Sequence, residues 1–356
     1  MIGRVAGSAA LAAVLTAGAT GAAVHAAPKG EPRWRVQQGP APRLVGSLNQ
    51  IEFADERHGW AAGVEGPDNE LALWKWNGRK WTRAKAGWGF VPAGLAVSGP
   101  RQAWATGVTL SAAHALHYNG KKWREVAFPG PGAPVDLAAA PDGTAVSVAR
   151  NVFDGTNTVQ RWKDGRWRPV KVPLPSGSSL AAVAAFSKRE IWLGGSRRVG
   201  EDAYESLLLR WNGRKWRRIP LKGTSSQQSK AITKIVVDVP GKAWALRGST
   251  KTKLLRWDGK KAGERGLPGG VGALTLTQDG AGGVWLLPYS RSDAKAAPYL
   301  RWSKGRWKSF TGPRRNGVVG LGDIELIPGT SRVVSVGGLQ QQKPKEHKFP
   351  MLEAFR

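Results

Sequence analysis

The chain has no cysteine among its 356 residues, so it forms no disulfide and carries no lipid on a cysteine. Beyond residue 26 it has no apolar run near the roughly 18 residues that a membrane-spanning helix needs. Several enzyme signatures are missing: there is no glycine-rich phosphate loop, no G-x-S-x-G and no H-E-x-x-H. Acidic residues are few, with 25 Asp and Glu against 54 Lys and Arg. The protein must therefore rely on its apolar core, and it carries a large positive charge.

The formal net charge is +29, which is extreme for a globular chain. Charge of this size says nothing about the fold, but it predicts attraction to polyanions and binding that weakens as salt is added. The partners that we expect are anionic polymers, such as teichoic acid, acidic polysaccharide or nucleic acid. Anionic lipid heads and a protein partner are the further possibilities.

The first 26 residues are typical of a secretory signal peptide. Arg4 is their only charge, an Ala-, Val-, Leu- and Gly-rich run follows from Val5 to Val24, and Val24-His25-Ala26 offers small residues for cleavage. We predict that residues 1–26 are a signal peptide and that residues 27–356 form one exported domain with a mature charge of 29 − 1 = +28. The protein would then be secreted and extracellular, or associated with the cell envelope. An uncleaved N-terminal anchor is the alternative.

The sequence repeats one hairpin pattern, in which an aromatic residue, a Gly-containing turn and a Trp follow one another. The pattern starts at Trp76, Tyr118, Trp162, Trp211, Trp257 and Trp302, which follow one another at intervals of 42, 44, 49, 46 and 45 residues. Four of the six turns contain Asn-Gly or Asp-Gly directly after the aromatic residue, and for these we expect type I′ turns with two positive φ angles. A period of this length, built from short strands, indicates the blades of a β-propeller.

Each repeat reads as four short strands, and the last repeat is incomplete in sequence order. The C-terminal part supplies three strands, the third from the tail at His347 to Arg356. The segment from Glu31 to Val36 matches the fourth strand of the third repeat, Gly165 to Val170. We therefore predict an all-β, seven-bladed β-propeller of four-stranded blades, monomeric, with the last blade closed by the N-terminal strand. An open ring of six blades is the alternative, and it leaves Trp34 without a role.

The repeats resemble the kelch repeat of the galactose-oxidase-type propellers. The likeness is best where Gly194-Gly195 precedes Trp211 and Trp216, and Gly337-Gly338 repeats the glycine pair. The segment from Phe53 to Gly63 also looks like Asp-box propellers of the photosystem-assembly kind. The kelch resemblance implies a ligand- or protein-binding platform. The copper oxidase activity of one branch needs a Cys-linked Tyr, so that activity does not carry over.

Basic residues recur at the hairpin turns of all six complete repeats. Turns of this kind share one face of a propeller, so we predict a ring of cations that binds polyanions. Its members are Arg79, Lys80, Lys121, Lys122, Arg166, Arg214, Lys215, Lys260, Lys261 and Arg306. The alternative is that these residues only keep the outer hairpins solvated and protect them from aggregation.

A second group of candidates lies on the loops of the opposite face, where Trp88 stands outside the repeat pattern. An exposed aromatic ring can stack on a sugar or a base, and arginines can clamp a carboxylate or phosphate. The candidate ligand-binding residues are Trp88, Phe90, Arg197, Arg198, Tyr204, Tyr289, Arg291, Arg314 and Arg315. Ordinary loop packing is the alternative for each. The other 17 Trp residues are expected to pack between blades.

The prediction for function is an exported, non-catalytic binding platform with no cofactor, no metal and no catalytic residue. His114 and His117 have a spacing that suits a metal, but no third ligand accompanies them. One alternative is an extracellular polysaccharide hydrolase or lyase that acts at the propeller centre, with an acidic residue or Tyr from 201–205 in the chemistry. The other alternative is a protein-interaction scaffold.

Overall fold

The computed structural model describes residues 32–41, 45–85, 87–128, 132–151, 153–221, 224–225, 230–248, 250–341 and 347–356. The chain divides into Met1–Pro32 and Arg33–Arg356, and the fold described is that of the second unit. The predicted signal segment, residues 1–26, lies outside the described residues. Within the described part, no helix has the length and apolar character to cross a membrane.

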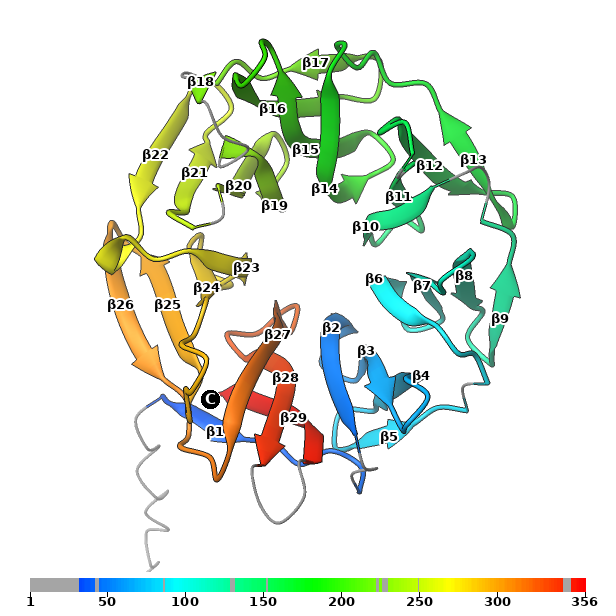
Figure 1. The fold of residues 1–356 in the computed structure, drawn as a ribbon, viewed down its shortest axis with the longest axis vertical. Coiled ribbons are helices and arrows are strands. Elements are labelled where there is room, and N and C mark those ends of the chain that lie inside the picture. Colours follow the sequence, from blue (N-terminus) through cyan, green and yellow to red (C-terminus); the bar gives the residue numbers. More distant parts are fainter. Residues whose placement is uncertain are drawn as a thin grey trace, which may run out of the picture. The chain divides into compact units, whose positions relative to one another are not determined.

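The unit Arg33–Arg356 is a ring of seven antiparallel sheets, as the sequence predicts (Figure 1). Six blades run in sequence order from the innermost to the outermost strand, and the fourth has the extra strand β18 at its edge. The strands are β2 Gly46–Asp55, β3 His58–Glu65, β4 Glu70–Trp76 and β5 Trp81–Arg83; β6 Val91–Gly99, β7 Gln102–Val108, β8 Ala113–Tyr118 and β9 Trp123–Val126; β10 Ala133–Ala139, β11 Ala145–Arg150, β12 Asn157–Lys163 and β13 Arg166–Val170; β14 Ser178–Ser187, β15 Glu190–Arg198, β16 Tyr204–Trp211, β17 Trp216–Arg218 and β18 Thr224–Ser225; β19 Ile232–Val239, β20 Lys242–Arg247, β21 Lys253–Trp257 and β22 Ala262–Gly266; β23 Ala273–Gln278, β24 Val284–Pro288, β25 Pro298–Ser303 and β26 Arg306–Thr311. A short 3-10 turn, η2 Pro268–Gly270, joins the fifth and sixth blades.

The seventh blade is closed by the N-terminal strand, and this confirms the prediction. It is built from β27 Val318–Leu326, β28 Val333–Gln341, β29 His347–Phe355 and β1 Trp34–Val36. Trp34 pairs with Phe355, and its ring stacks on Tyr299 of the sixth blade at 3.6 Å. Figure 1 shows β1 lying beside β29. Trp34 therefore joins the two ends of the described fold to each other and to the neighbouring blade.

The outer hairpins contain two kinds of turn. The prediction of type I′ geometry is wrong for the four turns in which Asn-Gly or Asp-Gly directly follows the aromatic residue. In the first blade Trp76 pairs with Trp81 across a four-residue loop in which Gly78 alone has a positive φ. The side chain of Asn77 accepts hydrogen bonds from the backbone of Arg79 and Lys80, and this local capping favours the longer loop.

Two-residue turns with two positive φ angles occur instead at Asp164-Gly165 and at Lys304-Gly305. The strands pair one residue further along in these two hairpins, at Lys163 with Arg166 and at Ser303 with Arg306. The same aromatic spacing is thus met by two loop lengths, and both leave basic residues at the tip.

Tryptophan packing between blades forms much of the core, as predicted. Trp60 on β3 contacts Tyr118 and Trp123 of the next blade, with ring centres 4.9 Å and 5.0 Å away. Trp74, Trp104, Trp192 and Trp285 are among the largest fully buried side chains. Because a buried aromatic side chain removes roughly 150–250 Å² from water, these rings are a main source of adhesion between the blades.

Candidate functional site

All ten predicted turn cations are exposed at the tips of the outer hairpins. The turns between the first and second strands lie at the same end of the blades and add further cations. Arg57 packs against Gly78, Arg101 against Gly120 and Arg189 against Gly213, so each inner turn touches the outer turn of its own blade. None of these inner-turn cations was among the residues predicted from the sequence. They extend the basic surface towards the centre of the ring.

The ten outer turn cations have no acidic partner within 4.0 Å in the part of the chain that the structure describes. Ion pairs at that distance involve other basic residues, such as Arg83 with Glu65, Arg197 with Glu205 and Arg332 with Glu56. Exposed and unpaired cations keep their donors available to an external anion. We refer to these ten residues as the turn cations.

In the seventh blade no turn joins the two outer strands, β29 and β1, but cations stand at this position as well. Arg33 and Arg356 exchange backbone hydrogen bonds of 3.0 Å and 3.3 Å where β1 meets β29, and both side chains are exposed. Beside them a cavity of about 290 Å³ is lined by Arg35, Arg79, Lys80 and Arg356 and by no acidic side chain. Cations from the last and first blades therefore converge on one hollow that suits an anion.

A second series of basic residues, on the third strands of several blades, has a structural role. Arg210, Arg256 and Arg301 pair with Glu190, Asp238 and Asp279 at 3.2 Å, 2.8 Å and 2.9 Å. Lys75 reaches the next blade, where its ammonium donates to the Tyr118 hydroxyl at 2.9 Å. These cations are already engaged, unlike those at the turns.

The nine predicted ligand-binding residues lie on four separate connections. Between β5 and β6, Trp88 is half-buried against the core of the first two blades and Phe90 is buried, with its ring stacked on His114 at 5.3 Å. Between β24 and β25, Tyr289 is half exposed and Arg291 is exposed and paired with Asp293 at 3.1 Å.

The remaining arginines of this group are partly engaged with the protein itself. Arg197 pairs with Glu205 at 3.2 Å, and Arg198 donates to the backbone oxygens of Gly200 and Glu201. Tyr204 lies next to them at the start of β16 and is partly exposed. After β26, Arg314 is exposed, whereas Arg315 forms an enclosed pair with Glu353 at 2.9 Å.

The ring encloses a central cavity of about 800 Å³ whose lining comes from the first strands and first turns of all seven blades. It opens at the end that carries the turn cations. Figure 1 shows the innermost strands of the seven blades around the axis, which are β2, β6, β10, β14, β19, β23 and β27. Every one of these strands contains a β-bulge. Asp136, Lys234 and Asp323 each stand directly after a bulge, and Glu52 and Glu325 follow two residues beyond the equivalent position. Bulges re-aim side chains, so charges from four blades gather near the axis.

We refer to Glu52, Asp136, Lys234, Asp323 and Glu325 as the channel charges. Of these, Glu52 and Glu325 line the central cavity, and the five act on one another. Burial raises the pKa of Glu52 to about 8, with Lys234 opposing the shift, and burial also raises the pKa of Glu325 well above its usual range. Burial likewise raises the pKa of Asp136. Burial alone would lower the pKa of Lys234, but attraction to the surrounding carboxylates outweighs it and the pKa is raised. The ammonium group of Lys234 thus offsets the negative charge of several carboxyl groups. Some of these carboxyls stay protonated at neutral pH.

Two of the channel carboxylates also join neighbouring blades. Asp323 accepts from the backbone N–H of Ile51 at 3.3 Å and from the Thr275 hydroxyl at 3.2 Å. Asp136 accepts from the N–H of Val183 at 2.8 Å. Innermost strands have an unpaired edge facing the axis, and these bonds satisfy some of its N–H groups. The sequence holds one sign of these channel charges, which is that charged residues interrupt the apolar first strands.

The acidic residues named for the enzyme alternative lie elsewhere. Glu205 is held by Arg197 at 3.2 Å and by Arg218 at 2.5 Å, and Glu201 is exposed on the loop before β16. None of the residues 201–205 is among those that line the described central cavity. Chemistry at the propeller centre would therefore have to use the channel carboxyls.

The seven four-stranded sheets define a seven-bladed β-propeller. No family model matches the sequence, and no curated protein sequence matches it either. Solved structures do share its fold. YCF48 bound to D1 peptide is 17% identical, with 90% of this chain and 96% of that chain covered and a TM-score of 0.58. YCF48 from Cyanidioschyzon merolae is 16% identical over 90% of this chain and 98% of that one, also with a TM-score of 0.58. The RRP9 WD40 repeats are 12% identical over 91% and 98%, with a TM-score of 0.60. At these identities the likeness establishes the propeller, and the kelch relationship stays a prediction.

Proposed function

We propose that this propeller is an exported, non-catalytic binding platform for anionic polymers and that the turn cations form its contact surface. The observation that carries the proposal is that ten exposed cations stand at one end of the blades, with no acidic partner among the residues that the structure describes. Polymers such as teichoic acid, acidic polysaccharide or nucleic acid offer repeated negative charges to such a surface. Binding of this kind releases counterions and needs no base- or sugar-specific pocket.

Export and a kelch-type ancestry are parts of the proposal that come from the sequence. Residues 1–26 support secretion, with the mature protein extracellular or held at the cell envelope by its charge. The glycine pairs Gly194-Gly195 and Gly337-Gly338 support kinship with kelch-type binding propellers.

The test is salt-dependent binding to a 30-base-pair DNA duplex, followed by retention on immobilised heparin. In one variant Lys80, Lys122, Lys215 and Lys261 are changed to Gln. In the matched control Lys85, Arg150, Lys251 and Lys295, exposed cations on or beside the loops at the other end of the blades, are changed to Gln. Each lost phosphate contact lowers the slope of log affinity against log salt by about 0.9, so the turn variant should lose about 3 to 4 and the control much less.

Two results would contradict this assignment. Equal slopes for the two variants would mean that net charge alone attracts the DNA, without a defined surface. Equal retention of the wild-type protein at low and high salt would remove polyanion binding altogether.

A second candidate function is the hydrolysis or cleavage of an acidic polysaccharide at the propeller centre. It is favoured by the raised pKa of Glu52, about 8, because a carboxyl that is protonated at neutral pH can donate a proton to a leaving group. Glu52→Gln should abolish release of reducing ends from hyaluronan, alginate or polygalacturonate. Absence of product from the wild-type protein on all three substrates would remove this candidate.

A further inference from the structure

Five blades share a pair of contacting side chains, and this pair is incomplete in the third blade. A Trp on the second strand lies beneath a basic side chain or a His of the third strand. Arg210 stands 5.5 Å from the ring of Trp192, and Arg256 stands 4.6 Å from the ring of Trp244. The other pairs are Lys75 with Trp60 at 5.6 Å, His117 with Trp104 at 5.4 Å and Arg301 with Trp285 at 5.4 Å.

The third blade keeps the cation but not the ring. Val146 occupies the Trp position, directly opposite Arg161 on β12. The guanidinium of Arg161 donates to the Thr144 hydroxyl at 3.3 Å. A cation placed over an aromatic face gains roughly 0.5–2 kcal/mol, and in this blade the protein supplies no such face.

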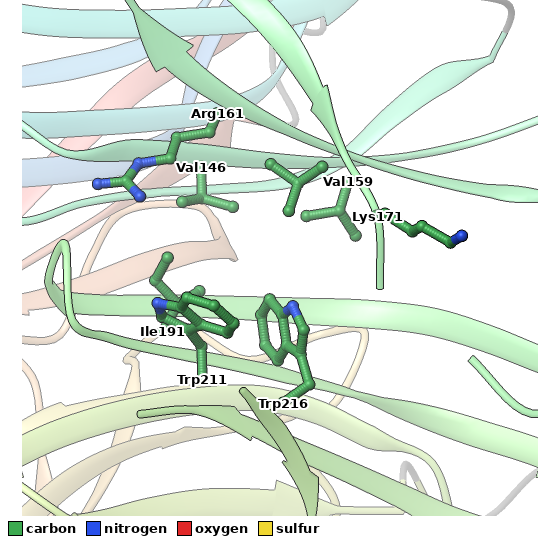
Figure 2. Close-up of a pocket in the computed structure, with 8 residues that line it drawn as sticks. Val146, Val159, Arg161, Lys171, Ile191, Trp211 and Trp216 are labelled. Carbon is green, nitrogen blue, oxygen red and sulfur yellow. The ribbon is translucent and has the colours of Figure 1, made fainter. Parts of the chain in front are cut away.

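A cavity of about 120 Å³ lies where the indole of the other blades packs. Its lining comes from two blades, with Val146, Val159, Arg161, Val170 and Lys171 on the third and Ile191, Trp211 and Trp216 on the fourth. Figure 2 shows the two indoles on one side, the valines on the other, and the basic groups of Arg161 and Lys171 at the edges.

The two indoles of the fourth blade are more exposed than the aromatic pair of the second blade, and the pair of the sixth blade, Trp302 and Trp307, is partly exposed as they are. Trp211 and Trp216 are partly exposed, whereas Tyr118 and Trp123, which Trp60 covers, are buried. The seventh blade also lacks the Trp, with Val334 in its place. There Phe53 of the first blade packs against Trp81 at 5.9 Å, and that blade carries no cation at the paired position, Ala354.

The residues that line the pocket favour an aromatic ring with a negatively charged group next to it. Its apolar walls and two indoles favour an aromatic group, while its polar side chains, Arg161 and Lys171, are both cationic and no acidic side chain lines it. The exposed turn cations Arg214 and Lys215 lie between Trp211 and Trp216 in the sequence of the same hairpin. Acidic residues on either side of the ring would therefore find cations at both ends of the pocket.

We propose that the pocket between the third and fourth blades binds an aromatic side chain of a partner protein, carried in an acidic segment. The ring enters between Val146 and the two indoles and lies under Arg161, in the place that the protein's own Trp fills in five other blades. The volume suits one side chain and not a chain of sugars. None of the turn cations lines the aromatic pocket itself, whereas the acidic flanks of the ligand would share Arg214 and Lys215 with the polyanion-binding surface. The pocket therefore gives the platform a second, more specific ligand.

The test uses the whole mature protein and an acetylated peptide amide of sequence Glu-Asp-Trp-Asp-Glu, with 5-fluorotryptophan as its aromatic residue. Fluorine NMR follows the ring directly, and we expect a dissociation constant on the order of 0.1–1 mM. Val146→Trp restores the indole of the other blades and fills the pocket, so it should weaken peptide binding at least tenfold. Its retention on heparin should be unchanged, which keeps this proposal distinguishable from the proposed function.

A second variant and two further ligands complete the experiment. Trp211→Leu removes one wall while it keeps an apolar side chain, and it should weaken the peptide about fivefold to tenfold, which decides the matter if Val146→Trp does not fold. The peptide Glu-Asp-Gly-Asp-Glu should bind at least tenfold more weakly. Equal binding of the Gly peptide, or unchanged binding by both variants, would overturn the pocket. Binding of free indole-3-acetate as tight as that of the Trp peptide would overturn the assignment to a protein partner.

Discussion

Two charged regions of this propeller, one at the tips of the outer hairpins and one at the axis, differ in sign and in surroundings. The turn cations stand at the periphery, exposed and without acidic partners, whereas Glu52, Asp136, Asp323 and Glu325 surround Lys234 at the axis. An exposed charge acts mainly at long range and is screened by salt, while an enclosed charge acts on its neighbours and on stability. The comparison implies that the periphery can be altered to change binding and the centre to change folding, each with little effect on the other.

The largest effect is expected from Lys234→Met, which removes the cation among the five channel charges. The carboxylates would lose their counter-charge, and we expect a loss of about 3 kcal/mol in the free energy of unfolding at pH 8. At pH 4.5 the loss should be smaller, because the carboxyls with raised pKa are then protonated. Urea unfolding followed by circular dichroism measures both values, and heparin retention should not change. An equal loss at the two pH values would show that packing of the Lys234 stem, and not its charge, is what matters.

At the periphery, the change of Lys80, Lys122, Lys215 and Lys261 to Gln should lower DNA affinity about 100-fold in 0.1 M salt. Its free energy of unfolding should stay within about 0.5 kcal/mol of the wild type, since exposed residues away from packing rarely do more. Fluorescence anisotropy of a labelled duplex and urea unfolding give the two numbers. A clear loss of stability would break the comparison, because it would make the turns structural.

Glu52→Gln tests whether a charge at the axis affects stability. The pKa of Glu52 is about 8 in the folded protein and near its ordinary value of 4.5 in the unfolded chain. The protonated form of Glu52 therefore adds to the free energy of unfolding. This contribution is complete below pH 4.5 and is lost as the pH rises to 8. Gln stays neutral throughout. The variant should equal the wild type at pH 4.5 and exceed it by about 2 kcal/mol at pH 9, after allowance for partial exposure of the channel. Urea unfolding across this range is the measurement, with exposed Glu201→Gln as control, and parallel curves for Glu52→Gln and wild type would contradict the assignment.

The ring and its closure could be predicted because they depend on short-range patterns. Trp34 matched the fourth strand of another blade, and the aromatic residue, turn and Trp recurred at a near-constant interval. The turn geometry could not be predicted in the same way, because the side chain of Asn77 caps a longer loop in place of the two-residue turn.

The central channel could not be predicted because its members come from four blades and meet only when the ring closes. A bulge before Asp136, Lys234 and Asp323 aims them inward, and no local pattern marks that bulge. The pocket between the third and fourth blades could be predicted in part. The sequence showed Val146 where five blades have Trp, but the cavity depends on the exposure of Trp211 and Trp216 across the interface.

The smallest effect is expected from one cation of an inner turn. Arg57 packs on Gly78 and lies nearer to the axis than Arg79 and Lys80, so it tests how far inward the binding surface extends. If the polyanion covers the inner turns, Arg57→Gln should lower the salt slope for DNA by about 0.9 and the affinity severalfold. If contact stops at the outer hairpins, the slope will not change and the mouth of the acidic channel is left uncovered. The carboxyls at the axis repel a polyanion, whereas the inner cations attract it, and the slope of this single variant measures which of the two prevails.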